Sequence, residues 1–156
     1  MTRYNLWGLV GSYMLFVRRR VADAVGPFDE MLGIGSPGPW RGGEDLDYVL
    51  RCLNSGFSLF YDPSLLVHHP KRREYSPRPD PKDAYGYAMG MGRVLRTGRL
   101  PAWFALYMCG RGFLGALVEL GRARPAHARF YWTAGRGRLR GYLSPGPGSR
   151  DVARSK

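Results

Sequence analysis

Residues 1–70 alternate between short apolar runs and breaks made of glycine or proline. The run Leu6–Val17 predicts a buried strand that Gly8 and Gly11 interrupt. The shorter runs Phe57–Tyr61 and Leu65–Val67 predict two further strands. Short strands of this kind next to a helix indicate an α/β fold class.

A helix is indicated most clearly over Glu44–Asn54, because leucines and valine recur there at helical spacing and Gly56 follows as a stop. A shorter helix is expected at Arg18–Val25, ending at Gly26. The segment Leu32–Gly43 between them is so rich in glycine and proline that it predicts a loop.

The second half of the chain predicts helices rather than strands. They are expected over Asp83–Arg96, Pro101–Gly121 and Ala126–Leu139. The chain should therefore have three parts: an α/β part over 1–75, a helical basic extension over 76–143 and a disordered tail over 144–156.

The segment Pro101–Gly121 is long and apolar enough to raise the question of a membrane span. Arg111 lies at its centre, where an arginine costs about 2.5–3.5 kcal/mol on insertion scales. Glu119 and internal glycines weaken a span further. A helix packed on the domain, or lying in the membrane interface with arginines towards lipid phosphates, is the preferred interpretation.

Charge adds a partner class to this picture. The 156 residues include 24 Lys and Arg against 12 Asp and Glu, a formal net charge of +12. Such an excess favours nucleotide diphosphates, nucleic acid or an acidic membrane surface as partners.

Cys52 and Cys109 are far apart and form no CxxC pair, which argues against a zinc scaffold and favours a reduced, cytoplasmic setting. We expect no signal peptide, because Met1–Asn5 leads directly into an apolar run.

Candidate chemistry concentrates at the start of the expected helix 44–54. Glu44, Asp45 and Asp47 stand within four positions, behind Gly42 and Gly43 and ahead of apolar residues. A solvated acidic patch requires neither the glycines nor the apolar residues. The pattern indicates a carboxylate at a helix N-terminus beside a cleft, where a general base could lie.

Taken in order, the motifs resemble the C-terminal, acceptor-side half of family 2 glycosyltransferases of the GT-A fold. The resemblance covers residues 7–70 and depends on the series rather than on one motif. The matching segments are Gly11-Ser12-Tyr13-Met14-Leu15-Phe16, Arg18-Arg19, Val25-Gly26-Pro27-Phe28-Asp29-Glu30, Gly43-Glu44-Asp45-Leu46-Asp47 with Arg51, Gly56, Tyr61-Asp62-Pro63 and Val67-His68-His69.

The resemblance implies inverting transfer of a sugar from a nucleotide-sugar donor to a hydroxyl of a glycan or lipid-linked acceptor. It makes Asp45 the general base; a helix cap is the alternative for this residue. Glu44 would bind acceptor hydroxyls or support them, and Trp40 would stack on a sugar or pack under its loop. Asp47 and Arg51 would line the substrate site or form an i, i+4 ion pair.

The resemblance also implies a divalent metal, Mn²⁺ or Mg²⁺, that neutralises the donor diphosphate. His69 stands where the family often has a metal-binding histidine. His68 is adjacent, and on a strand it would point to the opposite face. Either residue is a candidate ligand, and His69 is preferred.

The family's nucleotide-binding half would precede residue 7, where this sequence has no room for it. A truncated gene product, a partner chain or a misplaced start would each account for that.

The expected setting is the inner face of the plasma membrane, in polysaccharide or glycolipid synthesis. Two alternatives stay open: a non-catalytic membrane-peripheral subunit, and a basic nucleic-acid-binding module, against which the acidic cluster 44–47 argues.

Overall fold

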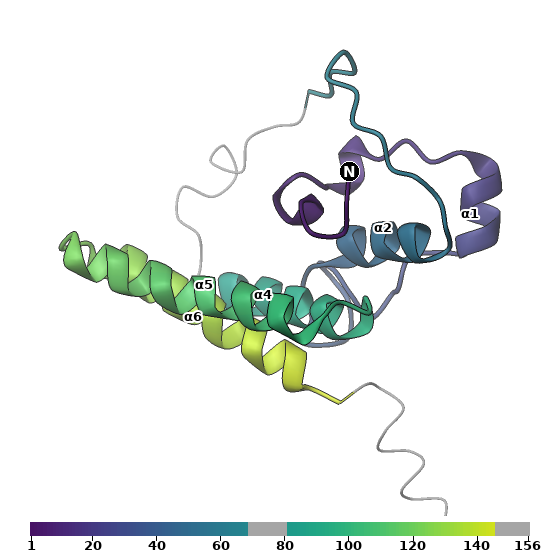
Figure 1. The fold of residues 1–156 in the computed structure, drawn as a ribbon. Coiled ribbons are helices and arrows are strands. Elements are labelled where there is room, and N and C mark those ends of the chain that lie inside the picture. The colour runs from purple at the N-terminus through teal and green to yellow at the C-terminus, as the bar shows by residue number, and fades with distance from the viewer. Residues whose placement is uncertain (69–80, 146–156) are drawn as a thin grey trace, which may run out of the picture.

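The computed structural model describes residues 1–68 and 81–145. Three long helices form one side of the molecule, and shorter elements pack on them (Figure 1). The long helices are α4 (Pro81–Thr97), α5 (Ala102–Gly121) and α6 (Pro125–Leu143). The shorter elements are the 3₁₀ turns η1 (Leu6–Gly8) and η2 (Ser12–Met14) and the helices α1 (Arg19–Val25) and α2 (Glu44–Asn54).

All five expected helices are present within a few residues of their predicted bounds. In α2, Leu46, Val49 and Leu50 are buried, as the helical spacing requires. Gly56 follows with a positive φ of 84°, the backbone conformation that commonly ends a helix. The helical extension is therefore confirmed as helical, with α6 ending at Leu143.

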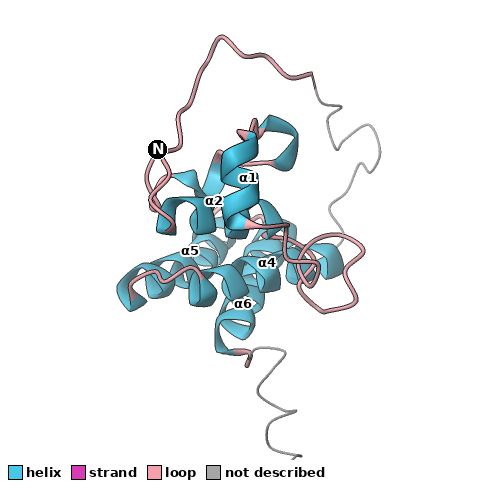
Figure 2. Cartoon of the chain, turned by 90° about the vertical axis from the view of Figure 1, so that its right-hand side faces the viewer, coloured by secondary structure: helices cyan, strands magenta, loops and turns pink. Residues whose placement is uncertain are grey.

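The expected strands are not found among the residues that the structure describes, none of which lies in a strand (Figure 2). The run Leu6–Val17 forms the turns η1 and η2 instead, and the α/β, GT-A-like architecture is not found there. A strand is stable only when its backbone groups pair with a neighbour. No described segment offers Leu6–Val17 such an edge, so local turns between its glycines satisfy the backbone.

The other two expected strands are extended but unpaired. Leu59 packs on the core cluster, but Phe60 is 87% exposed and Leu66 is 81% exposed, so most of their apolar surface is left uncovered by the described residues. Between them Asp62 accepts hydrogen bonds from the amide and hydroxyl of Ser64, which makes a local turn. Apolar composition alone could not distinguish this arrangement from a buried sheet.

Helix α4 joins the two sides of the molecule. Val94 on α4 packs into a cluster with Leu50 of α2, whereas the adjacent Leu95 packs with Phe104 and Met108 of α5. Both Val94 and Leu95 are almost completely buried. The region around α2 therefore rests on the helical extension through a shared core.

Helices α4 and α6 pack at backbone contact distance. A β-carbon at Gly92 would collide with the carbonyl oxygen of Arg138, and one at Gly141 would collide with that of Met89. Small residues allow this approach, which brings α4 and α6 together along most of their length (Figure 1). On the other side of α6, Gly112 of α5 packs in the same way against Gly135.

Candidate functional site

The acidic cluster lies at the first turn of α2, and a closed loop leads into it. The amide of Gly33 donates to the carbonyl of Trp40 at 2.9 Å, which closes the loop, and the amide of Arg41 donates to the carbonyl of Gly86 on α4 at 3.1 Å. Gly43 then precedes the helix with a φ of 92°. A side chain there would be strained and would also contact Gly90 of α4, so both glycines before the carboxylates have a structural reason.

Asp45 does not cap α2. Gly43 occupies the N-cap position, and no side chain makes a cap hydrogen bond. The Oδ1 atom of Asp45 is buried and accepts no hydrogen bond from the residues that the structure describes. A buried carboxylate oxygen without a donor is costly, and such atoms need an explanation such as a ligand or a catalytic role.

Glu44 lies beside Asp45 and faces the loop. A β-carbon at Gly33 would lie 3.0 Å from its carboxyl carbon, so the glycine makes room for this side chain. Burial raises the pKa of Glu44, its own backbone amide lowers it, and the neighbouring Asp45 charge raises it again. The carboxyl groups of Glu44 and Asp45 thus lie on one helix turn, where the charge of Asp45 acts on Glu44.

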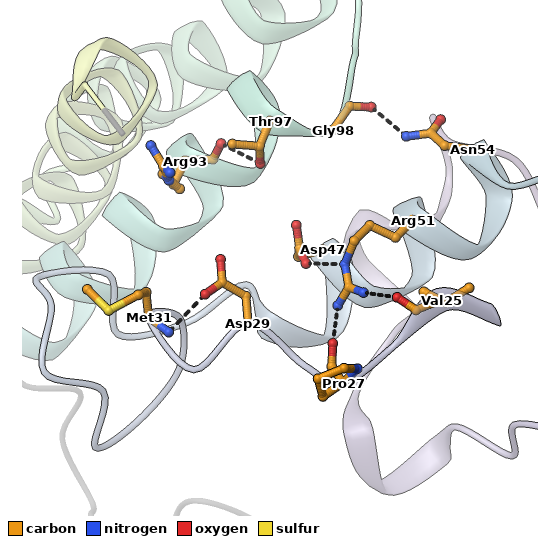
Figure 3. A network of polar contacts seen from close by, with 10 residues as sticks. All are labelled: Val25, Pro27, Asp29, Met31, Asp47, Arg51, Asn54, Arg93, Thr97 and Gly98. Atoms are coloured by element: carbon orange, nitrogen blue, oxygen red, sulfur yellow. Dashed lines mark hydrogen bonds and ion pairs between the residues drawn. The ribbon is translucent and has the colours of Figure 1, made fainter. Parts of the chain in front are cut away.

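Asp47 and Arg51 form the i, i+4 ion pair that their spacing allows. The Nε atom of Arg51 donates to Asp47 Oδ2 at 2.8 Å, and its two terminal nitrogens donate to the carbonyls of Val25 and Pro27 at 2.9 and 2.8 Å (Figure 3). Phe28 stacks on Tyr48 at 4.4 Å between ring centroids, close to the same contact. Arg51 therefore fixes the turn after α1 to α2, and a contact of Asp47 or Arg51 with substrate stays a prediction.

Trp40 is packed under its loop, one of the two interpretations that the sequence allowed. It is 6% exposed and belongs to the same core cluster as Leu50. The guanidinium of Arg93 on α4 lies 4.8 Å from the centre of its ring. Its indole nitrogen is buried and donates to no described acceptor. Stacking on a sugar would need this loop to open, and it stays a prediction.

Sequence reasoning missed the contribution of α4 to this region. Arg93 covers Trp40, and Gly90 lets the backbone of Gly42 cross the helix closely. The available signal was the spacing of Gly86 and Gly90 by one helical turn, because glycines repeated on one face of a helix indicate close backbone approach.

The candidate metal ligands do not form a site in the part of the chain that is described. His68 is exposed at the end of the extended segment, and His69 lies outside the described residues. Within 1–68 and 81–145, no group of three or more His, Cys, Asp or Glu side chains could hold a metal ion. Because His69 lies outside the described residues, the divalent metal stays a prediction, and no step below depends on it.

The chain was compared with protein-family models, with curated proteins and with solved structures. None of the three comparisons finds a match. The resemblance to family 2 glycosyltransferases therefore depends on the motif series alone, and the argument for function depends on the geometry around Asp45.

Proposed function

We propose that this chain is the acceptor-side part of an inverting glycosyltransferase, with Asp45 as the general base. The observation that carries the proposal is the buried Oδ1 atom of Asp45, which has no described hydrogen-bond donor. An acceptor hydroxyl is a suitable donor, because it offers one O–H group that a carboxylate can bind and then deprotonate.

The proposed step is a direct displacement. The acceptor hydroxyl gives its proton to Asp45 as its oxygen forms a bond with the anomeric carbon of the donor sugar. The nucleoside diphosphate leaves from the opposite face of the sugar and takes the electron pair of the broken bond. Inversion at the anomeric carbon follows from this single displacement.

Neighbouring residues have distinct parts in this proposal. Glu44 lies one position away from Asp45 and would accept a second hydrogen bond from the acceptor. Asp47 and Arg51 hold α2 against the turn after α1 and so position the base. Trp40 and Arg93 lie beneath the loop that leads into the helix.

The donor side would come from elsewhere. In the family that the motifs resemble, nucleotide binding belongs to another half of the enzyme, so in this proposal the donor is held by residues other than those around Asp45. The exposed apolar segments around Phe60 and Leu66 fit this idea, because a strand-forming sequence gains stability when a neighbouring sheet covers it. The expected setting is the cytoplasmic side of the plasma membrane.

Labelled sugar transfer in membranes of producing cells tests the proposal. Cells producing the native chain should transfer label from one of the UDP-, GDP- or dTDP-sugars to a membrane acceptor. Asp45→Asn should lower that rate about 100-fold or more, the usual contribution of a general base. Asp23→Asn is the matched control, because the same change is made on the exposed helix α1 at an aspartate that pairs only with Arg19 in the described residues.

Two readouts, folding and transfer, distinguish a loss of the base from a loss of the fold. Equal circular dichroism spectra and equal thermal midpoints for the native chain and Asp45→Asn would show that the fold is intact. Native-like transfer by Asp45→Asn would exclude Asp45 as the base. Transfer that is no greater with the native chain than in cells without it would exclude the activity itself.

A further inference from the structure

The outer face of α5 is apolar and mostly exposed, although Tyr4 stacks on Trp103 with 5.7 Å between the ring centroids. Exposed side chains recur there every three or four residues, which places them on one face. Leu106 is 68% exposed, Leu114 is 62% exposed and Leu117 is 63% exposed. The α5 outer face, as defined here, consists of Trp103, Leu106, Tyr107, Leu114, Leu117 and Val118.

A cationic cavity borders this face where α5 meets α6. It has a volume of about 330 Å³, and its lining combines Arg111, Arg122 and the carboxylate-bearing Glu119 with Leu114, Gly115, Val118 and Tyr131, so the two guanidinium groups exceed the single acid by one charge. The cavity is shallow enough to open on the surface that carries the exposed leucines. It thus offers two guanidinium groups to an anion at the edge of an apolar surface.

The positive charge at this edge is only partly neutralised. Glu119 accepts from Arg122 at 2.9 Å and lies 3.9 Å from Arg124. No described carboxylate pairs with Arg111, which contacts the sulfur of Met108 and the ring of Tyr107. Burial and, secondly, the nearby charge of Arg111 lower the pKa of Arg138 on the facing helix, which donates to the carbonyl of Met108 at 3.1 Å.

The chemistry of the surface selects among possible occupants. Nucleic acid would satisfy the arginines but leave the leucines of the α5 outer face in water. A second copy of the chain would bring another surface with the same excess of arginine, at a net charge of +12 for each copy. An anionic lipid surface satisfies both groups, because acyl chains cover leucines while phosphates pair with arginines.

We propose that the α5 outer face docks on an anionic lipid surface, with Arg111 and Arg122 at the headgroup phosphates and the leucines among the upper acyl chains. Trp103 and Tyr107 belong to the same face, and a helix that lies flat places such aromatic side chains at the headgroup level that suits them. This inference is independent of sugar transfer and would hold for a non-catalytic chain as well.

The helix lies along the membrane in this proposal and does not cross it. By length and composition α5 is the one helix in the described residues that could span a bilayer. Its inner face, however, packs on α6 through Gly112 and carries the buried Glu119 with its ion pairs. A flat orientation keeps those contacts, whereas a crossing orientation would move Glu119 and Arg111 into hydrocarbon.

Vesicle flotation with the purified full chain tests the proposal. The native chain should float with vesicles of phosphatidylcholine and phosphatidylglycerol at physiological salt, and much less with phosphatidylcholine alone. Emission of Trp103 should shift to the blue on binding, and Trp103→Phe should remove most of that shift. Absence of binding to the mixed vesicles would overturn the proposal.

Matched substitutions locate the surface. Leu106→Gln with Leu117→Gln should weaken binding about ten-fold, since two exposed leucines no longer enter the bilayer. Leu66→Gln is the control, because Leu66 is even more exposed than Leu106 and Leu117 but lies outside the α5 outer face. Arg111→Gln should weaken binding about five-fold, the effect of one cation beside anionic lipid, and Arg20→Gln should have a smaller effect.

The remaining outcomes each contradict the proposal. Full binding by the double leucine variant would show that the arginines alone attract the chain. Resistance of bound protein to alkaline carbonate would indicate a spanning helix. Retention of the chain as a dimer in solution, with the dimer lost in Leu106→Gln/Leu117→Gln, would assign the α5 outer face to a second copy.

Discussion

The region around α2 and the bundle of α4, α5 and α6 are stabilised in different ways. Around α2, single polar side chains hold loops in place: Arg51 alone donates to Asp47, Val25 and Pro27. In the bundle, glycines bring helices to backbone contact, and few polar groups are needed. Loops that hydrogen bonds hold in place are well suited to carry a functional site, whereas a close-packed helix bundle is well suited to support those loops.

The largest effect is expected where the bundle is tightest. Gly141→Ala places a β-carbon against the carbonyl of Met89, so α4 and α6 must separate. We expect a loss of about 3 kcal/mol in the free energy of unfolding, typical of severe overpacking.

The matched control for this substitution lies on the adjacent helix. Gly110→Ala meets no atom within 4 Å and should stabilise α5 by up to about 1 kcal/mol through helix propensity. Urea unfolding followed by circular dichroism measures both variants. Equal stability of Gly141→Ala and the native chain would contradict the close contact of α4 and α6.

A smaller effect is expected from the polar contacts around α2. Arg51→Met leaves Asp47, which is 8% exposed, without its ion-pair partner and removes the donors for Val25 and Pro27. Because Arg51 is itself partly exposed, we expect a loss of about 2 kcal/mol in the free energy of unfolding.

Arg19→Met is the matched control, since Arg19 forms an i, i+4 pair on an exposed helix and should contribute less than about 0.5 kcal/mol. Thermal unfolding of both variants gives the comparison. If Arg51→Met and Arg19→Met had the same midpoint, the turn after α1 would not depend on Arg51.

The smallest effect concerns the pH dependence of stability. Burial and Asp45 raise the pKa of Glu44 above its ordinary value of 4.5 in the folded state. The folded chain then holds this proton to higher pH than the unfolded chain does, so the contribution of Glu44 to stability declines as pH rises from about 4.5 through the raised pKa.

Glu44→Gln should remove this loss of stability with rising pH. The difference in unfolding free energy between the variant and the native chain should therefore change with pH only between about 4.5 and the raised pKa of Glu44. NMR titration of the Glu44 side-chain carbon measures the pKa directly. In Asp45→Asn the Glu44 pKa should move down, because one of the groups that raise it is gone. A Glu44 pKa at or below 4.5 in the native chain would contradict the burial of this carboxyl.

The sequence predicted the helices well because each carries its own signal. Helix α2 has apolar residues on one face and a glycine stop, and its backbone hydrogen bonds are internal. Strands lack this independence. The runs at 57–61 and 65–67 have strand composition, but whether they pair depends on an edge that local sequence does not specify.

The site was predictable only in part for the same reason. The cluster of Glu44, Asp45 and Asp47 and the Asp47–Arg51 pair follow from helical spacing. The cover that Arg93 gives Trp40 depends on how α4 crosses the loop, which is a tertiary contact. That the Oδ1 atom of Asp45 lacks a donor is likewise visible only once the surrounding loops are placed.

Hydrogen exchange of the whole chain, resolved to single amides by NMR, tests most directly whether the candidate base stands on a rigid helix beside unpaired segments. Amides 48–54 of α2 should exchange as slowly as those in the middle of α4, because both helices share one core. Amides 58–61, 66 and 67 should exchange at nearly unprotected rates. Strong protection at 58–61 would show a paired strand and restore the α/β prediction, whereas rapid exchange throughout α2 would contradict a fixed position for Asp45.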